Sequence, residues 1–148
     1  MLDEGVYVDT SVLGAYYCPE QLSAAAEKAL RTARIPAISV LSEVEFSSLI
    51  VRKRRLKELT ELQAQGILSL FESHVAEGFY RRIALTSEHF LKARQLIGTT
   101  NGALHTLDAL HLAAAVTESL TLLTADRDLA KAAKRHTRGV TLIRSSAS

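Results

Sequence analysis

An α/β domain, with a central parallel sheet between layers of helices, is the fold class that the sequence predicts. Short β-favouring runs alternate with helical segments along the 148 residues, and parallel strands need such crossovers. A hydrophobic content of 47% without long polar tracts is enough for one core. We therefore expect one three-layer α/β/α domain over residues 1–144 and a short polar tail over 145–148.

The expected strands are short runs rich in β-branched and apolar residues. They cover residues 6–8, 37–41, 82–86, 120–124 and 140–143. The first strand ends in Asp9-Thr10-Ser11, three residues that suit a turn or a helix cap.

Helical patterns fill the intervals between these strands. They predict helices over residues 24–34, 42–54, 87–97, 104–119 and 126–136. Leucines between residues 56 and 71 also keep a helical spacing, and Gly66 predicts that this segment divides into an antiparallel hairpin. The Gly-Thr-Thr-Asn-Gly run at 98–102 predicts a loop.

The composition indicates a cytoplasmic protein without a membrane segment. The acidic start lacks the basic and apolar segments of a secretory signal, and no apolar run approaches the ~20 residues of a membrane span. The single cysteine, Cys18, is expected to be a small buried hydrophobe rather than a nucleophile. A net charge of +2 is too small to indicate a nucleic-acid partner by itself. Glycine-rich phosphate loops and the serine-hydrolase elbow are absent from the sequence.

Two aspartates follow predicted strands and should lie at the carboxyl edge of the sheet, where ligands of open α/β folds bind. Asp9 follows the strand at 6–8, and Asp126 follows the strand at 120–124. Each could instead cap the next helix, because aspartate is a favoured N-cap residue.

The helix after the second strand offers a third acid at this edge. Glu45 has the apolar neighbours Val44 and Phe46, which favours an inward-facing side chain, and Glu43 is a competing candidate. Ser42 and Glu45 also fit a capping box, in which the Glu45 side chain would bind the Ser42 amide.

Asp108 stands in an apolar helical run, where an ionised carboxylate without a partner would be costly to bury. An arginine, a cap position or a metal ion could each compensate its charge. His111 lies three residues later on the same helical face, and we expect a hydrogen-bonded core histidine there rather than a metal ligand.

Carboxylates are hard oxygen ligands, which suit Mg²⁺ or Mn²⁺, whereas zinc sites usually recruit Cys or His. Two such ions held by shared carboxylates could activate a water molecule and stabilise the leaving oxygen of a phosphodiester. The acids are therefore compatible with a metal-dependent phosphodiesterase, although for Asp108 the spacing alone favours a structural role over a metal ligand.

Four segments, in this order along the chain, resemble the signature segments of PIN-domain ribonucleases. They are Val8-Asp9-Thr10-Ser11-Val12-Leu13, Leu41-Ser42-Glu43-Val44-Glu45-Phe46, Leu107-Asp108-Ala109-Leu110-His111-Leu112-Ala113 and Leu123-Thr124-Ala125-Asp126-Arg127-Asp128-Leu129. The set spans nearly the whole chain. Single-domain members of this size are mostly VapC toxins of toxin–antitoxin pairs.

The resemblance implies a catalytic and metal-binding quartet. Its members are Asp9, Glu45, Asp108 and Asp126, with Ser11 and Thr124 as polar supports and Asp128 close behind the ligands. The implied activity is Mg²⁺- or Mn²⁺-dependent endonuclease cleavage of structured RNA such as tRNA or ribosomal RNA. The implied partners are a second copy of the chain, forming a homodimer, and a cognate VapB-type antitoxin.

Two basic clusters are candidate phosphate contacts, although a charged run is usually a solvated helix face. The first holds Arg52, Lys53, Arg54, Arg55 and Lys57, and the second holds Arg127, Lys131, Lys134, Arg135 and Arg138. Two other functions fit the sequence less well. One is a non-catalytic RNA-binding module. The other is a phosphatase-like hydrolase with Asp9 as nucleophile, which would want a second acid where this chain has Ser11.

Overall fold

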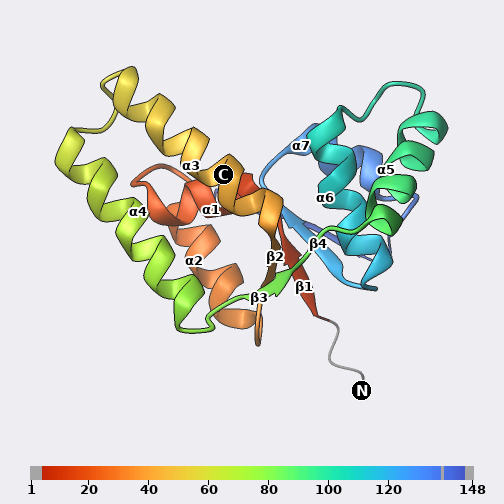
Figure 1. Ribbon diagram of the computed structural model, residues 1–148, viewed down its shortest axis with the longest axis horizontal. Coiled ribbons are helices and arrows are strands. Elements are labelled where there is room, and N and C mark those ends of the chain that lie inside the picture. The colour runs from red at the N-terminus through yellow and green to blue at the C-terminus, as the bar shows by residue number, and fades with distance from the viewer. Residues whose placement is uncertain (1–4, 138, 146–148) are drawn as a thin grey trace.

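The computed structural model describes residues 5–137 and 139–145 and confirms the α/β class (Figure 1). Over these residues, five parallel strands form one sheet in the order β3-β2-β1-β4-β5. The strands are β1 Val6–Val8, β2 Ala37–Ser39, β3 Arg81–Ile83, β4 Thr121–Thr124 and β5 Val140–Leu142. β1 is central because it pairs with β2 on one side and with β4 on the other.

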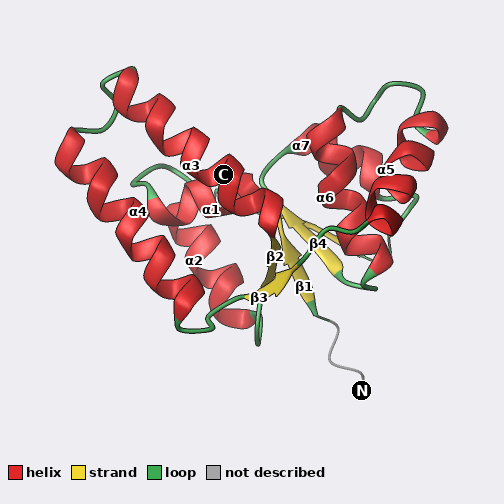
Figure 2. Ribbon diagram, in the orientation of Figure 1, coloured by secondary structure: helices red, strands yellow, loops and turns green. Residues whose placement is uncertain are grey.

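Helices cover both faces of the sheet (Figure 2). They are α1 Thr10–Tyr17, α2 Ser23–Thr32, α3 Val40–Arg55, α4 Glu61–Ala76, α5 Ser87–Thr99, α6 Thr106–Thr117 and α7 Arg127–Ala133. The first four pack on one face and the last three on the other, so the predicted three layers are present.

Alternating side chains of the strands divide the hydrophobic interior into two clusters. Tyr7 and Leu122 belong to the cluster beneath α5, α6 and α7. Their neighbours Val8 and Leu123 belong to the cluster beneath α1 to α4. Successive strand residues point to opposite faces of the sheet. Because helices cover both faces, the residues on both sides of the short central strands are apolar.

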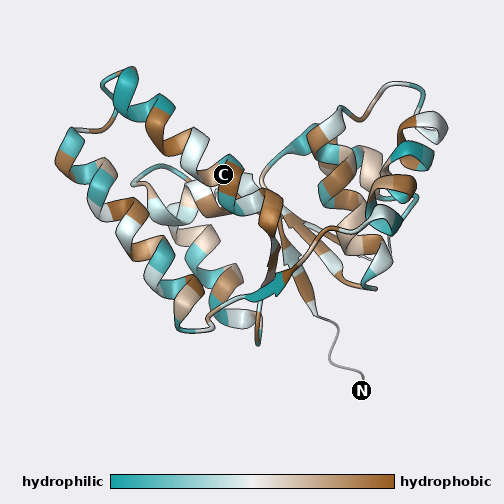
Figure 3. Ribbon diagram, viewed as in Figure 1, coloured by the Kyte–Doolittle hydropathy of each residue, from teal (hydrophilic) through white to brown (hydrophobic). Residues whose placement is uncertain are grey.

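Edge and centre of the sheet differ in hydropathy. Figure 3 shows β3 as hydrophilic, whereas β1 and β2 carry apolar residues. Arg81 and Arg82 of β3 are exposed, and charges of this kind protect an edge strand against unwanted pairing. In the part of the chain that is described, no helix is long and apolar enough to cross a membrane. Cys18 is buried, as predicted, and burial raises the pKa of its thiol.

Near the carboxyl edge, one helix was missed and one predicted boundary was wrong. A helix, α1, begins directly after Asp9 and was not predicted beyond a possible cap. The second strand ends at Ser39 rather than at 41, because Ser39 and Ser42 form a capping box that starts α3 at Val40. A reciprocal pair of hydrogen bonds of this kind satisfies the first free amides of a helix.

The helical hairpin divides at residues 56–60, not at Gly66. Lys57 adopts a positive φ of 60° in this turn. Thr60 then caps α4 through a capping box with Gln63. Gly66 lies inside α4 with nothing within 4 Å of where a Cβ would stand, so the glycine costs some helix propensity and leaves the helix unbroken.

Smaller differences concern the remaining ends. β3 is shorter than predicted because Thr86 becomes the N-cap of α5, and α5 runs on to Thr99, which shortens the predicted 98–102 loop. α6 begins at Thr106 rather than 104. α7 ends at Ala133, and the predicted basic residue Arg138 lies outside the described residues.

Candidate active site

Asp9 lies at the carboxyl end of the central strand, with its side chain only 8% exposed. Its backbone N–H donates to the Leu123 carbonyl at 2.9 Å, which fixes it against β4. Its Oδ2 accepts hydrogen bonds from the hydroxyls of Ser11 at 2.6 Å and Thr124 at 2.9 Å. Asp9 occupies the N-cap position of α1 without a side-chain cap bond. The carboxylate is therefore positioned by two hydroxyls, and its Oδ1 is left facing the site.

Glu45 reaches the same region from α3. Its Oε1 accepts from the Thr10 hydroxyl at 2.8 Å and contacts Nε2 of His111. The predicted capping box between Ser42 and Glu45 is wrong, because Ser42 pairs with Ser39 instead. Glu43 turns outward and forms an ion pair with Arg82 on β3. The two glutamates differ in direction, because Glu43 pairs with Arg82 whereas Glu45 contacts His111, and this difference favours Glu45 as the site acid.

His111 is a buried, hydrogen-bonded histidine, as predicted, with 1% of its side chain exposed. Its Nδ1 lies 2.6 Å from the Tyr7 hydroxyl, which lies 2.9 Å from Ser39 Oγ. Its Nε2 also lies 4.0 Å from Asp9 Oδ1. Burial alone would lower the pKa of His111, but the Glu45 hydrogen bond and the nearby carboxylates outweigh burial and raise it.

The bond to His111 acts on Glu45 in return. Burial would raise the pKa of Glu45, but the hydrogen bonds from His111 and Thr10 outweigh burial and lower it. Glu45 is therefore an ionised carboxylate at neutral pH, with one oxygen fixed by two donors.

Asp108 has the opposite surroundings. It lies half-buried in the first turn of α6, and no described residue gives it a hydrogen bond or an ion pair. The arginine that could have compensated it is not there. Burial raises the pKa of Asp108, and the negative charges of Asp9 and Asp126 raise it further. This carboxylate is close enough to two others to be repelled by them.

Asp126 is a helix cap, which was one of its two predicted roles. Its Oδ1 accepts the backbone N–H groups of Asp128 at 2.9 Å and Leu129 at 3.1 Å. Its own backbone N–H donates to Thr124 Oγ1 at 3.0 Å. The side chain is exposed and keeps Oδ2 unbound within the described residues. Capping and cation binding are compatible here, because they use different oxygens.

The four predicted acids gather at one edge but do not form a closed coordination shell. Among the described residues, no three His, Cys, Asp or Glu side chains converge closely enough to hold a metal ion. The donor chemistry nevertheless fits Mg²⁺ or Mn²⁺, because each acid has a hard oxygen to which no described residue donates. A cation would also relieve the repulsion around Asp108.

Tyr7 and Thr10 were missed as parts of this site. Tyr7 stands in the middle of an apolar strand. A buried tyrosine hydroxyl needs a hydrogen-bond partner, so its position in the sequence could have indicated a polar neighbour. Thr10 follows Asp9 directly, and the sequence pattern indicated only a turn or cap residue there. Neither residue could be connected to His111 without knowing that α6 packs beside β1 and α1.

Comparisons with known proteins agree with this architecture. Residues 6–135 match the model of the PIN domain family. No curated protein matches the chain significantly.

Solved structures resemble the chain over nearly their whole length. A toxin–antitoxin complex from Klebsiella pneumoniae is 21% identical, with a TM-score of 0.64 over 93% of this chain and 96% of that one. FitAcB from Neisseria gonorrhoeae is 15% identical, with a TM-score of 0.70 over 97% and 99%. VapBC2 from Rickettsia felis, bound to a DNA fragment from its promoter, is 17% identical, with a TM-score of 0.65 over 92% and 96%. At these identities the likeness is one of fold.

Proposed function

The chain belongs to the PIN domain family, and from this premise we propose that it is a metal-dependent endoribonuclease and the toxin of an antitoxin-controlled pair. The observation that carries the proposal is Asp108, a half-buried carboxylate repelled by Asp9 and Asp126 and without a partner in the described chain. A structural role would have supplied a donor, as it does for Asp9. If Asp108 binds a cation, it needs no protein donor, and this accounts for the missing donor.

We assign the cation to Asp9, Glu45, Asp108 and Asp126. When bound, Mg²⁺ or Mn²⁺ would supply charge neutralisation at the scissile phosphate and a more acidic water. Ser11 and Thr124 hold Asp9 in place for this task. His111 and Thr10 hold one oxygen of Glu45, and the α7 cap holds one oxygen of Asp126. Ligands fixed in this way lose less freedom when a cation binds.

The toxin assignment is supported by the structures that the chain resembles. The Klebsiella pneumoniae structure is a toxin–antitoxin complex, and VapBC2 binds promoter DNA. A protein of this kind would meet a VapB-type antitoxin and would cut a structured RNA such as tRNA or ribosomal RNA. Association into a homodimer is supported by apolar side chains on the α3–α4 hairpin, where Leu56 and Leu62 are 59% and 79% exposed.

Cleavage of RNA by the purified protein tests the proposed activity. Total RNA is incubated with Mn²⁺, with Mg²⁺ or with chelator, and the Asp9→Asn variant is the control. We expect metal-dependent fragments from wild type and none from the variant. Phosphate release from p-nitrophenyl phosphate without RNA cleavage would identify a phosphatase instead. RNA binding that needs neither metal nor Asp9, again without cleavage, would identify a binding module.

Toxicity and light scattering test the partners. Expression of the chain should arrest growth unless a neighbouring small gene is expressed with it, and the purified protein should scatter as a dimer at micromolar concentration. A monomer that is not toxic would remove the toxin assignment and leave the nuclease untouched.

A further inference from the structure

A groove of about 570 Å³ lies between the end of α5 and the outer side of α7. Thr99, Thr100 and Asn101 line one wall, and Asp128, Lys131 and Arg135 line the other. The groove begins next to the acidic site, because the backbone N–H of Asp128 donates to Asp126 Oδ1. Apart from this backbone bond of Asp128, the groove residues have no role in the proposed catalytic centre.

Positive charge along this groove has no partner in the described chain. Arg127, Lys131, Lys134 and Arg135 are exposed, and no described acid pairs with them. Lys131 and Arg135 line the groove, and Arg127 lies one turn before Lys131 on α7, about 6 Å along the helix axis.

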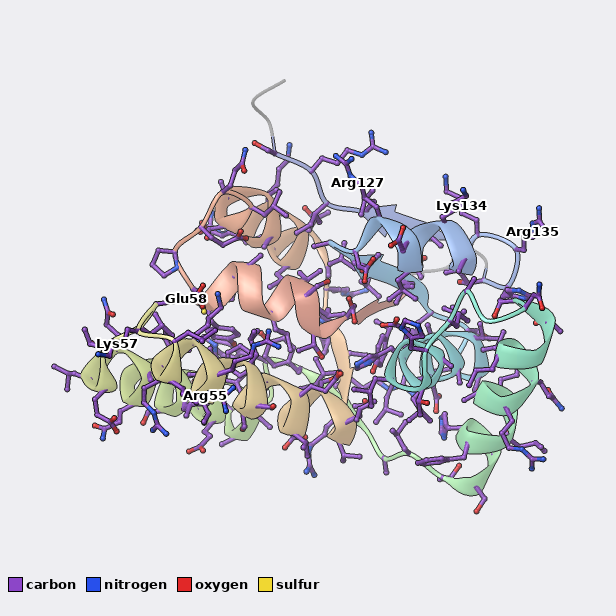
Figure 4. The ribbon with its side chains drawn as sticks, turned by 90° about the horizontal axis from the view of Figure 1, so that it is seen from above. Arg55, Lys57, Glu58, Arg127, Lys134 and Arg135 are labelled. Atoms are coloured by element: carbon purple, nitrogen blue, oxygen red, sulfur yellow. The ribbon has the colours of Figure 1, made fainter. Side chains whose placement is uncertain are left out.

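The basic cluster at the end of α3 differs in the pairing of its cations and in its position on the molecule. Two of its cations are already paired, Lys53 with Glu58 at 3.9 Å and Arg54 with Glu61 at 3.4 Å. Figure 4 shows Arg55 and Lys57 at the far end of the α3–α4 hairpin, whereas Arg127, Lys134 and Arg135 extend from α7 and the turn after it, on the opposite arm. The two predicted clusters are therefore not equivalent as phosphate contacts.

The opposite wall of the groove offers hydrogen-bond acceptors. The hydroxyls of Thr99 and Thr100 donate to the Leu96 carbonyl at 3.1 and 2.9 Å. Their protons are thus engaged, and their oxygens remain as acceptors. A ribose 2′-hydroxyl can donate to such an oxygen, whereas DNA lacks this group.

We propose that this groove binds the RNA strand on one side of the cleaved bond, with phosphates on Lys131 and Arg135 and ribose hydroxyls toward Thr99 and Thr100. The proposal rests on the proposed nuclease function and adds the path of its substrate. Asp128 is the one acid in the groove, so the phosphates lie toward Lys131 and Arg135 and away from it.

Binding of a labelled single-stranded RNA of twelve nucleotides, measured by fluorescence anisotropy in chelator, tests the path without cleavage. The K131Q/R135Q variant should weaken binding roughly tenfold to thirtyfold near 0.1 M salt. Its logarithmic salt dependence should become less steep by about 1.4, since two phosphate contacts on a single strand are lost. The matched control R52Q/R55Q removes the same charge and should change both quantities by less than half as much. Thermal unfolding should be unchanged in both variants, because all four side chains lie on the surface.

Two further variants sharpen the result. Asp128→Asn should tighten binding, because it removes a repelled carboxylate. In cleavage assays with Mn²⁺, K131Q/R135Q should raise KM and leave kcat nearly unchanged, because these contacts lie outside the reacting atoms. A DNA strand of the same sequence should bind more weakly than the RNA, and Thr100→Val should reduce that difference.

The outcomes separate this proposal from the one on which it rests. Equal losses in K131Q/R135Q and R52Q/R55Q, or a larger loss in the control, would overturn the groove. Loss of RNA binding only in K131Q/R135Q, in a protein that never cleaves RNA with either metal, would keep the groove and remove the nuclease. Unchanged RNA binding together with loss of binding to an antitoxin would show that the groove serves a protein partner.

Discussion

The two halves of the acidic edge are built on different principles. Asp9 and Glu45 are held by four donors from α1, α6 and β4, and the bonds continue through His111 to Tyr7 and Ser39 in the core. Asp108 and Asp126 face the same region, but the described chain gives Asp108 no donor, and Asp126 uses one oxygen for a cap. Half of the edge is internally satisfied, and the other half keeps carboxylate oxygens that no described residue binds.

This difference matters because stability and function are separated between the halves. Carboxylates with donors stabilise the fold, since an acceptor that loses its donor in a buried site is costly. Carboxylates that repel one another oppose the fold and favour cation binding. In the absence of metal, loss of a donor in the first half should therefore destabilise the fold, whereas loss of the Asp108 charge should not.

The largest expected loss of stability is at His111. His111→Ala removes a buried ring and the donor of Glu45, and should cost about 3 kcal/mol in the free energy of unfolding measured by urea. Mn²⁺ affinity should also fall, by about 10- to 100-fold, because Glu45 loses an orienting partner. His89 is a second buried histidine, which lies beside Glu118 rather than beside the four site acids, and His89→Ala serves as the control. A His111→Ala protein with unchanged Mn²⁺ affinity would limit His111 to a packing role.

Asp108 should give the reverse result. Asp108→Asn removes one of three mutually repelling charges at nearly constant shape, so without metal the variant should be as stable as wild type or more so. With metal present at a hundred times its dissociation constant, wild type should gain about 2.7 kcal/mol, the variant should gain little, and RNA cleavage should be lost.

The pH dependence of the same pair adds a check. Because the pKa of Asp108 is raised in the folded chain, its ionisation opposes folding. Its contribution to stability without metal is present below the usual carboxyl pKa and is lost as the pH rises through the raised one. Asp108→Asn should flatten this fall. A destabilised Asp108→Asn protein, with a wild type indifferent to metal, would show that Asp108 anchors a buried bond.

How far the sequence could predict these halves depends on the range of the interactions. The strands and the order of acids at their ends follow from local patterns, and so the edge and its four acids were predictable from motifs around Asp9 and Asp126. The start of α3 was not, because Ser39 could serve either as the last strand residue or as a cap. A helix pattern also could not show that Gly66 would stay helical while Lys57 took the turn.

Contacts across the chain were beyond these patterns. His111 was expected to be hydrogen-bonded, but its partners Tyr7 and Glu45 lie 104 and 66 residues away. The choice between Glu43 and Glu45 depended on Arg82 of β3, because Arg82 forms an ion pair with Glu43. Strand register and the rotation of each helix about its axis decide such contacts, and neither can be predicted from one segment of sequence.

A smaller loss is expected at Thr124, which belongs to the satisfied half. Thr124→Val keeps the shape but removes the hydroxyl that donates to Asp9 and accepts from the Asp126 amide. Removing these two bonds at a buried position should cost roughly 1–2 kcal/mol in urea unfolding. Cleavage should fall as well, because Asp9 keeps only the Ser11 donor. Equal stability of Thr124→Val and wild type would mean that water replaces the hydroxyl, and the edge would then be more open than its burial indicates.

The smallest change in stability is expected at Asp126, where the two halves meet in one side chain. Asparagine caps helices about as well as aspartate, so Asp126→Asn should keep the bonds to the Asp128 and Leu129 amides and change the free energy of unfolding by only a few tenths of a kcal/mol. Asp126→Ala removes the cap and should cost roughly 1 kcal/mol. Both variants lose the carboxylate, so both should lose most of the stabilisation by Mn²⁺ and most RNA cleavage. If the cap were the whole role of Asp126, Asp126→Asn would respond to Mn²⁺ and cleave RNA like wild type, and only Asp126→Ala would differ. Urea unfolding of the two variants with and without Mn²⁺ therefore distinguishes a ligand that also caps from a residue that only caps.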